Sequence, residues 1–173
     1  AWATQRKGAR VMMVLHVSGS MGEPADPADP NGPTKLDLAK QAVIEGLDDF
    51  NAADRVGLRI FTTDDNGTPT VTDLSPVAPI GPKRESLVNQ VDSLIPLAGT
   101  PLYQVTQESY DQMLAGYDPS LINAVIVLTD GQNDDGDPAD DADQFANLLA
   151  DVKRNSDGET AKGHADQLRP TGD

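Results

Sequence analysis

The sequence predicts an α/β fold with a doubly wound, mostly parallel β-sheet flanked by helices. Two apolar runs, 11–15 and 124–128, lack the alternation of a half-exposed strand, which is typical of strands covered on both faces. Segments with apolar residues at helical spacing separate and follow these runs, and this order implies right-handed crossover connections. Hydrophobic residues make up 38% of the chain and aromatic residues only 4%, so Val, Leu, Ile and Ala must build the core.

We expect residues 1–173 to form a single domain, with an ordered core over about 9–154 and a polar tail or truncated end over 155–173. The run at 11–15 predicts a central strand. Residues 23–33 contain four prolines and three carboxylates, a composition that neither a helix nor a central strand accepts. We therefore expect an exposed loop directly after the first strand.

The next segment predicts an amphipathic helix that ends near residue 51. Thr34 and Asp37 have the spacing of a capping box, with Asp in place of the usual Glu. Apolar residues then recur at helical intervals, which predicts one buried face. That face consists of Leu36, Ala39, Val43, Leu47 and Phe50.

Two strands are predicted after this helix. Residues 55–62 carry Val56, Leu58, Ile60 and Phe61 and predict one strand, and 68–74 predict a shorter, more polar one that suits a sheet edge. The turn at 64–67 joins them. The Asn-Gly-Thr at 66–68 also matches a glycosylation acceptor, but Asn-Gly is equally a hairpin turn, which is the interpretation we favour.

Three helices and one strand complete the predicted order. Residues 83–95 predict a helix that Pro96 ends, and a second helix begins near Pro101. Residues 122–129 predict another buried parallel strand. A last helix is indicated by the helical spacing of Ala142, Phe145, Leu149 and Val152.

Polar residues follow the ends of two predicted strands, with Ser18 after the first and Asp130 after the one at 122–129. Since doubly wound sheets bind ligands beyond the carboxyl ends of their strands, we expect one shared site there. Ser18 and Ser20 are two residues apart in an extended segment, which turns both hydroxyls the same way. Mg²⁺ takes six oxygens and keeps several waters, so these hydroxyls with Thr100 and Asp130 suit it.

Three ordered motifs resemble those of von Willebrand factor A-like domains, a Rossmann-like three-layer sandwich, and the likeness covers nearly the whole chain. Residues 16–20 (His-Val-Ser-Gly-Ser) match the first motif of that family's metal-ion-dependent adhesion site, MIDAS, except at the opening residue. Residues 99–102 match its threonine loop, and 128–131 match its second aspartate loop. The resemblance implies that Mg²⁺, or else Mn²⁺ or Ca²⁺, is bound directly by hydroxyls and mainly through waters by the aspartate, with an acidic group of a partner protein completing the shell. The residues that carry over are Ser18, Ser20, Thr100 and Asp130.

His16 stands where the family motif has an aspartate. Imidazole suits Zn, Cu, Ni or Fe better than Mg²⁺, and its presence removes one negative charge beside the ion. We therefore expect a weakened or empty metal site. A hydrogen-bonded core histidine is the alternative that we favour over a purpose-built ligand, and His164 in the polar tail is expected to be merely exposed.

The resemblance implies a protein-binding or adhesion module whose task is recognition. The alternative is a structural or assembly domain that has a degenerate metal site and binds its partner without metal. We expect no enzyme activity, because the chain has no Cys, no Gly-x-Ser-x-Gly elbow and no P-loop. A metal-assisted hydrolase would need a general base, which only His16 offers.

The formal charge of −15 argues against binding to nucleic acid or to an anionic membrane surface, and no apolar run is long enough for insertion into a membrane. Seven aspartates crowd residues 130–143, but the EF-hand template puts Gly131 and Ala142 at ligand positions, so a solvated loop and helix start is the better interpretation.

A further strand and helix are expected to follow the strand at 122–129 in this family. Without them, that strand would leave an uncovered sheet edge and invite self-association. The likeness to bacterial members of the family implies an extracellular or cell-surface location.

Overall fold

The structure is a computed structural model that describes residues 7–63, 68–97, 99–131, 133 and 138–157. The chain divides into two compact units, 1–136 and 137–173. The predicted turn at 64–67 and His164 lie outside the described residues, as do most of the polar tail and part of the aspartate-rich run. The single-domain assignment therefore stays a prediction.

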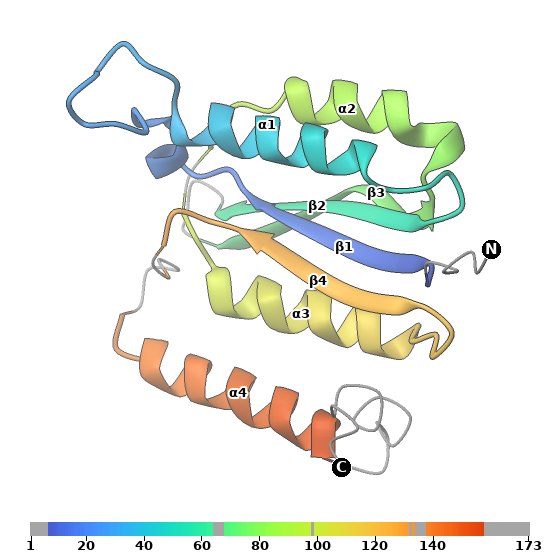
Figure 1. Ribbon diagram of the computed structural model, residues 1–173. Coiled ribbons are helices and arrows are strands. Elements are labelled where there is room, and N and C mark those ends of the chain that lie inside the picture. The colour runs from blue at the N-terminus through green and yellow to red at the C-terminus, as the bar shows by residue number, and fades with distance from the viewer. Residues whose placement is uncertain (1–6, 64–67, 98, 132, 134–137, 158–173) are drawn as a thin grey trace, which may run out of the picture. The chain divides into compact units, whose positions relative to one another are not determined.

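The first unit contains a four-stranded sheet in the order β3-β2-β1-β4. β1 pairs in parallel with both β2 and β4, and β3 pairs with β2 in antiparallel fashion. This arrangement confirms the α/β class and the mostly parallel sheet (Figure 1). The strands are β1 (Ala9–His16), β2 (Arg55–Thr63), β3 (Pro69–Pro79) and β4 (Ile122–Leu128).

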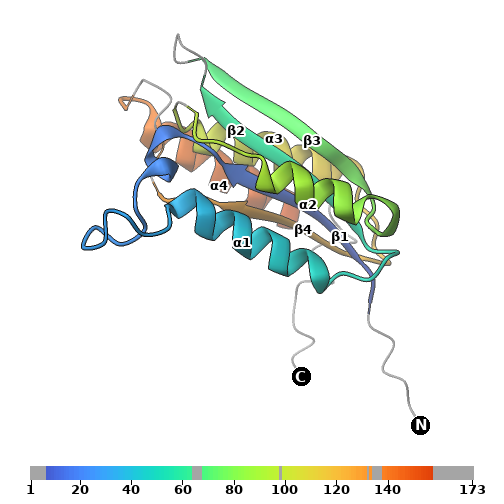
Figure 2. The same cartoon turned by 90° about the horizontal axis from the view of Figure 1, so that it is seen from above.

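Helices cover both faces of this sheet. α1 (Lys35–Asp48) and α2 (Arg84–Asp92) lie side by side on one face, and α3 (Leu102–Ala115) lies on the other (Figures 1 and 2). Two short 3-10 turns, η1 (Gly19–Gly22) and η2 (Gly81–Lys83), follow β1 and precede α2. The predicted capping box of α1 is present, since the Thr34 hydroxyl accepts from the Asp37 amide and the Asp37 carboxylate accepts from the Thr34 amide.

Two apolar clusters fill the spaces between the sheet and its helices. Because strand side chains alternate between faces, β1 contributes Met13 and Leu15 to the cluster under α1 and α2. It contributes Met12 and Val14 to the cluster under α3, where Phe61 also lies. β1 is buried along its full length, as its apolar run predicts.

Two strand predictions are corrected. β3 continues to Pro79 instead of ending at 74, and its prolines are tolerated because β3 is an edge strand and its pairing with β2 is interrupted by irregularities in register. β4 is not a buried strand. Among the described residues it pairs only with β1, and this edge position leaves Ile122 and Ile126 52% and 40% exposed.

The second unit is described through the predicted last helix, α4 (Asp141–Asp157). Its apolar side chains Phe145, Leu149 and Val152 are exposed. Among the described helices, none has both the length and the apolar character that a membrane crossing requires.

Candidate cation site at the carboxyl ends of β1 and β4

The site begins where β1 ends. Ser18 caps η1, and Ser20 lies within this turn, which is closed by a hydrogen bond from the Met21 amide to the Ser18 carbonyl (3.1 Å). The Val17 amide donates to the carbonyl of Phe61 at 3.3 Å and so ties the start of the loop to β2. The two serines are thus held on a short loop fixed to the central strands.

Ser18, Ser20 and Asp130 lie together, as their positions after β1 and β4 predict. The two serine hydroxyl oxygens are 2.9 Å apart, and Ser20 Oγ donates to Asp130 Oδ1 at 3.1 Å. Because a carboxylate only accepts, the Ser20 proton points to Asp130, so Ser18 is the donor in the pair of serines. Both hydroxyl protons are therefore directed along one chain that ends at the carboxylate.

Thr100 joins this group through His16. The Thr100 hydroxyl lies 2.7 Å from His16 Nε2, and its side chain is buried. The preceding residue, Gly99, has a φ of +66°, and a Cβ there would lie 1.8 Å from Thr63 Oγ1. Glycine is therefore required at 99 to bring Thr100 to the end of β1.

His16 is a packed, hydrogen-bonded residue, only 1% exposed. Its Nδ1 lies 3.0 Å from Asp130 Oδ1, and its ring stacks on Phe61. Burial lowers the pKa of His16 and outweighs the opposing effects of Asp130 and of a backbone hydrogen bond at Gly99. In the neutral ring Nδ1 carries the proton toward the carboxylate, which leaves Nε2 to accept from Thr100.

Lys35 is a member of the site that the sequence analysis missed. Its Nζ donates to Asp130 Oδ2 at 3.0 Å and to Glu23 Oε2 at 2.9 Å. Its hydrogen bonds to Glu23 and then to Asp130 raise the pKa of Lys35, so the side chain stays positively charged. The sequence signal was a lysine at the first position of a helix, where the helix dipole disfavours a cation unless acidic partners are present.

Asp130 is the centre of the charge arrangement. Its burial raises the pKa, but hydrogen bonds from Lys35 and Ser20, together with the positive charge of Lys35, have the larger combined effect and lower it. One carboxylate oxygen faces His16 and Ser20, and the other faces Lys35. Asp130 is therefore ionised, with both oxygens engaged.

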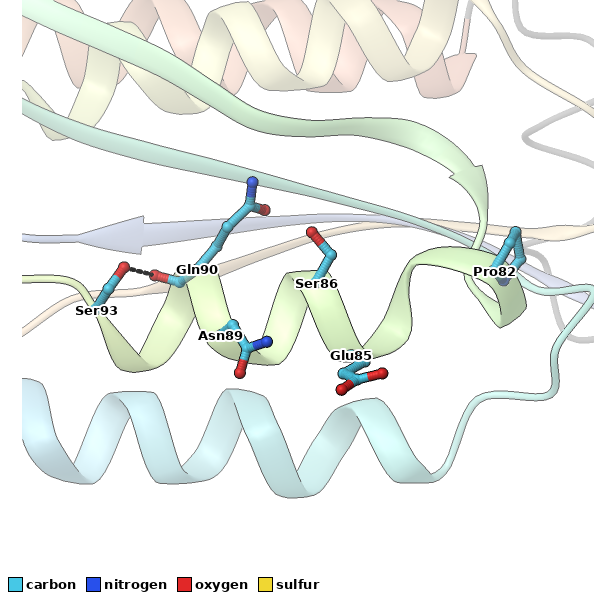
Figure 3. A pocket seen from close by; sticks show the side chains of 6 residues that line it. All are labelled: Pro82, Glu85, Ser86, Asn89, Gln90 and Ser93. Carbon is cyan, nitrogen blue, oxygen red and sulfur yellow. Dashed lines mark hydrogen bonds between the residues drawn. The ribbon is translucent and has the colours of Figure 1, made fainter.

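A shallow groove along α2 is a weaker candidate for a site. Its volume is about 480 Å³, and one hydrogen bond, from the Ser93 hydroxyl to the Gln90 carbonyl, joins lining residues (Figure 3). None of its lining side chains is buried. The groove therefore lacks the fixed polar groups that mark the cluster around Asp130. It is lined by Pro82, Glu85, Ser86, Asn89, Gln90 and Ser93.

Known structures share this architecture. The von Willebrand factor type A protein from Catenulispora acidiphila superposes with a TM-score of 0.59 at 22% identity, over 80% of this chain and 30% of that one. The fold is that of a von Willebrand factor A domain. The chain thus spans less than a third of that protein's length. No protein-family model matches the sequence, and no curated protein matches it significantly.

Two further structures are similar to this chain in fold. Proximal thread matrix protein 1 from the mussel byssus, solved with a zinc-occupied MIDAS motif, gives a TM-score of 0.53 at 18% identity, over 83% of this chain and 36% of that one. The pilus adhesin SpaC from Lactobacillus rhamnosus GG gives 0.56 at 19% identity, over 75% of this chain and 16% of that one.

The residues of this von Willebrand factor A fold fit a divalent ion only in part. Serine and carboxylate oxygens are suitable donors for a hard cation. The charge balance is not suitable, because the Asp130 carboxylate already faces the Lys35 ammonium and His16 beside it brings no negative charge. Over the described part of the chain, no three or more His, Cys, Asp or Glu side chains are grouped so that they could hold a metal. The arrangement does not suit tight binding of a divalent ion.

Proposed function

We propose that the chain is a protein-binding module of the adhesion type and that the cluster around Asp130 is its contact site. The observation that carries this proposal is the convergence of Ser18, Ser20 and Asp130 beyond the ends of β1 and β4 in a von Willebrand factor A fold. In doubly wound sheets this edge is where ligands bind. The partner is a protein that presents an acidic side chain.

The names of similar structures support this function and a location outside the cell or on its surface. They include a pilus adhesin and a byssus matrix protein. The net charge of −15 opposes nucleic acid as the partner. A role in recognition without turnover is also supported, because the neutral His16 is enclosed by Thr100, Asp130 and Phe61 and does not face an open pocket as a general base would.

In this proposal the site binds Mg²⁺, Mn²⁺ or Ca²⁺ only weakly. His16 in place of a carboxylate and the ammonium group on Asp130 both reduce the negative charge that would attract such an ion. The second candidate is a structural or assembly domain that binds its partner without metal. The contact between Lys35 and Asp130 favours that candidate.

A selection experiment tests the contact site. Peptides are selected from a displayed random library against the wild-type chain, after removal of those that bind an Asp130→Asn chain. We expect the survivors to share an acidic residue. The matched control is Asp92→Asn, which removes the same charge from an exposed position on α2 and should bind them normally.

Two results would overturn the proposal. One is that the selection leaves no peptide, because every peptide that binds the wild-type chain also binds the Asp130→Asn chain and is removed. The other is release of phosphate from p-nitrophenyl phosphate by the wild-type chain, which would indicate an enzyme. Repeating the binding in EDTA shows whether a bound metal ion takes part in the contact, because binding that does not use a metal is then unchanged.

A further inference from the structure

We propose that Lys35 is the resident cation of this site and that it binds an acidic side chain of a protein partner in exchange for Glu23. This inference rests on the proposed function and deepens it, since it names the group that receives the partner. Lys35 lies between two carboxylates, at 3.0 Å from Asp130 and 2.9 Å from Glu23. An ammonium group held this way supplies the positive charge that a divalent ion would otherwise bring to Asp130.

The position of Lys35 is fixed by its backbone. It is the first residue of α1, directly after the Thr34 cap, and its amide donates to the Glu23 carbonyl at 3.0 Å. Residues 24 and 34 form an isolated antiparallel bridge, and the Ala25 amide donates to the Pro33 carbonyl at 2.9 Å. The base of the loop is therefore closed, and it holds Glu23 opposite Lys35.

The two ion pairs of Lys35 differ in strength. Asp130 is 16% exposed and also bonded to Ser20 and His16, so its side chain has little freedom. Glu23 is 65% exposed. Ion pairs with such an exposed partner contribute little, because water and salt screen them and a long side chain must be ordered. An incoming carboxylate can replace Glu23 while Asp130 keeps the ammonium group in place.

This exchange conserves charge and hydrogen bonds. Lys35 loses one carboxylate and gains another, so no charge is left without a counterion, and the released Glu23 returns to water. The adjoining loop carries Asp26 and Asp29 on its exposed surface, which repel a partner of uniformly negative charge. The partner that fits is a peptide segment with one acidic residue among neutral or basic neighbours.

Nuclear magnetic resonance of the Lys35 side chain tests the proposal. The probe is a blocked Gly-Gly-Glu-Gly-Gly peptide, added in EDTA to the full chain, with Gly-Gly-Gln-Gly-Gly as its control. We expect only the Glu peptide to shift the Lys35 Nζ signal in a saturable way. Glu23→Gln should increase its affinity by up to about fivefold, because the internal competitor is an exposed ion pair. Glu45→Gln, an exposed change on the same helix, should not.

Substitution of Lys35 itself should lower the affinity for the Glu peptide. Lys35→Met should abolish binding of the Glu peptide and Lys35→Arg should retain it, whereas Lys40→Met removes a charge elsewhere on α1 and should leave it unchanged. The affinity gain in Glu23→Gln can be measured even if Lys35→Met fails to fold. Binding that needs Mg²⁺, or that persists in a folded Lys35→Met chain, would overturn the inference while the proposed function stands. Failure of the library selection would instead overturn the proposed function.

Discussion

The imidazole of His16 stacks on the ring of Phe61, with the ring centroids 4.9 Å apart and the planes inclined by 15°. Both ring nitrogens are also engaged, Nε2 by Thr100 at 2.7 Å and Nδ1 by Asp130 at 3.0 Å. Position 16 is therefore part of the packed core as well as part of the site. A substitution there changes stability and cation binding together.

His16→Asp should lower the free energy of unfolding in EDTA by about 1–3 kcal/mol, because it removes the stack and hydrogen bonds and places a second carboxylate beside Asp130. The same change should raise the affinity for Mg²⁺ by roughly tenfold or more, as expected when a group that orients or neutralises the ion is restored. Calorimetric titration with MgCl₂ measures the affinity, and thermal melts with and without MgCl₂ measure stability.

His16→Gln is the matched control for this prediction. It also removes the ring but adds no charge, so its melting temperature should fall without any response to Mg²⁺. Equal Mg²⁺ affinities for the wild-type chain and His16→Asp would show that the residue at 16 does not limit metal binding.

The stability of the wild-type chain should decrease on mild acidification. Burial lowers the pKa of folded His16, whereas in the unfolded chain histidine titrates near its ordinary pKa of about 6.5. Below about pH 6.5 the His16 side chain therefore binds a proton in the unfolded chain but not in the folded chain. The contribution of the neutral His16 to the free energy of unfolding is fully present above about pH 6.5. It is lost as the pH falls toward the pKa of His16 in the folded chain.

Urea denaturation between about pH 7.5 and pH 5 measures this loss, because histidine is the side chain that titrates in that window. His16→Gln should show a smaller change than the wild-type chain. Asp130 does not confuse the comparison, since its lowered pKa places its own loss of stability below about pH 4. Parallel pH profiles for the two chains would contradict the prediction.

Gly99→Ala should destabilise the chain by more than about 1 kcal/mol. The φ of +66° disfavours any side chain, and the new Cβ would overlap the Thr63 side chain. Gly131→Ala is a close control, because its φ is also positive at +146° but no atom lies within 4 Å of the added carbon. Urea denaturation should show the larger loss for Gly99→Ala, and equal losses would mean that Thr63 moves aside freely.

Local sequence patterns were sufficient to predict most of the fold. A continuous apolar run indicated β1, the apolar residues within 55–62 indicated β2, and the Thr34 and Asp37 spacing indicated the start of α1. These signals are local, so they do not depend on how the rest of the chain folds. The serine, threonine and aspartate motifs are also local signals, and their order along the chain predicted that Ser18, Ser20 and Asp130 lie at one edge of the sheet.

Contacts between distant parts of the chain were not predictable in this way. Lys35 meets Asp130 across 95 residues, and His16 meets Thr100 across 84. The hydrophobic periodicity and the composition of the sequence carry no information about such pairs. These pairs nevertheless determine the charge of the site. The apolar run at β4 predicted a buried strand and was wrong, since such a run does not tell a central strand from an edge strand. Only the family resemblance indicated that this edge would be uncovered without a further strand.

A buried arginine gives a last prediction, about the packing of α3 on the sheet. Arg59 on β2 binds both carboxylate oxygens of Asp73 at 2.6 and 3.1 Å and donates to Ser109 Oγ at 3.1 Å. The guanidinium group also donates to Gln112. Ser109→Ala leaves the buried Nη1 of Arg59 without this acceptor, so it should cost about 1–3 kcal/mol in urea denaturation. Thr106→Ala removes a hydroxyl from the same helix that bonds only to the Leu102 carbonyl, and it should cost less. If the two variants were equally stable, Arg59 would not depend on Ser109 to hold α3 in place.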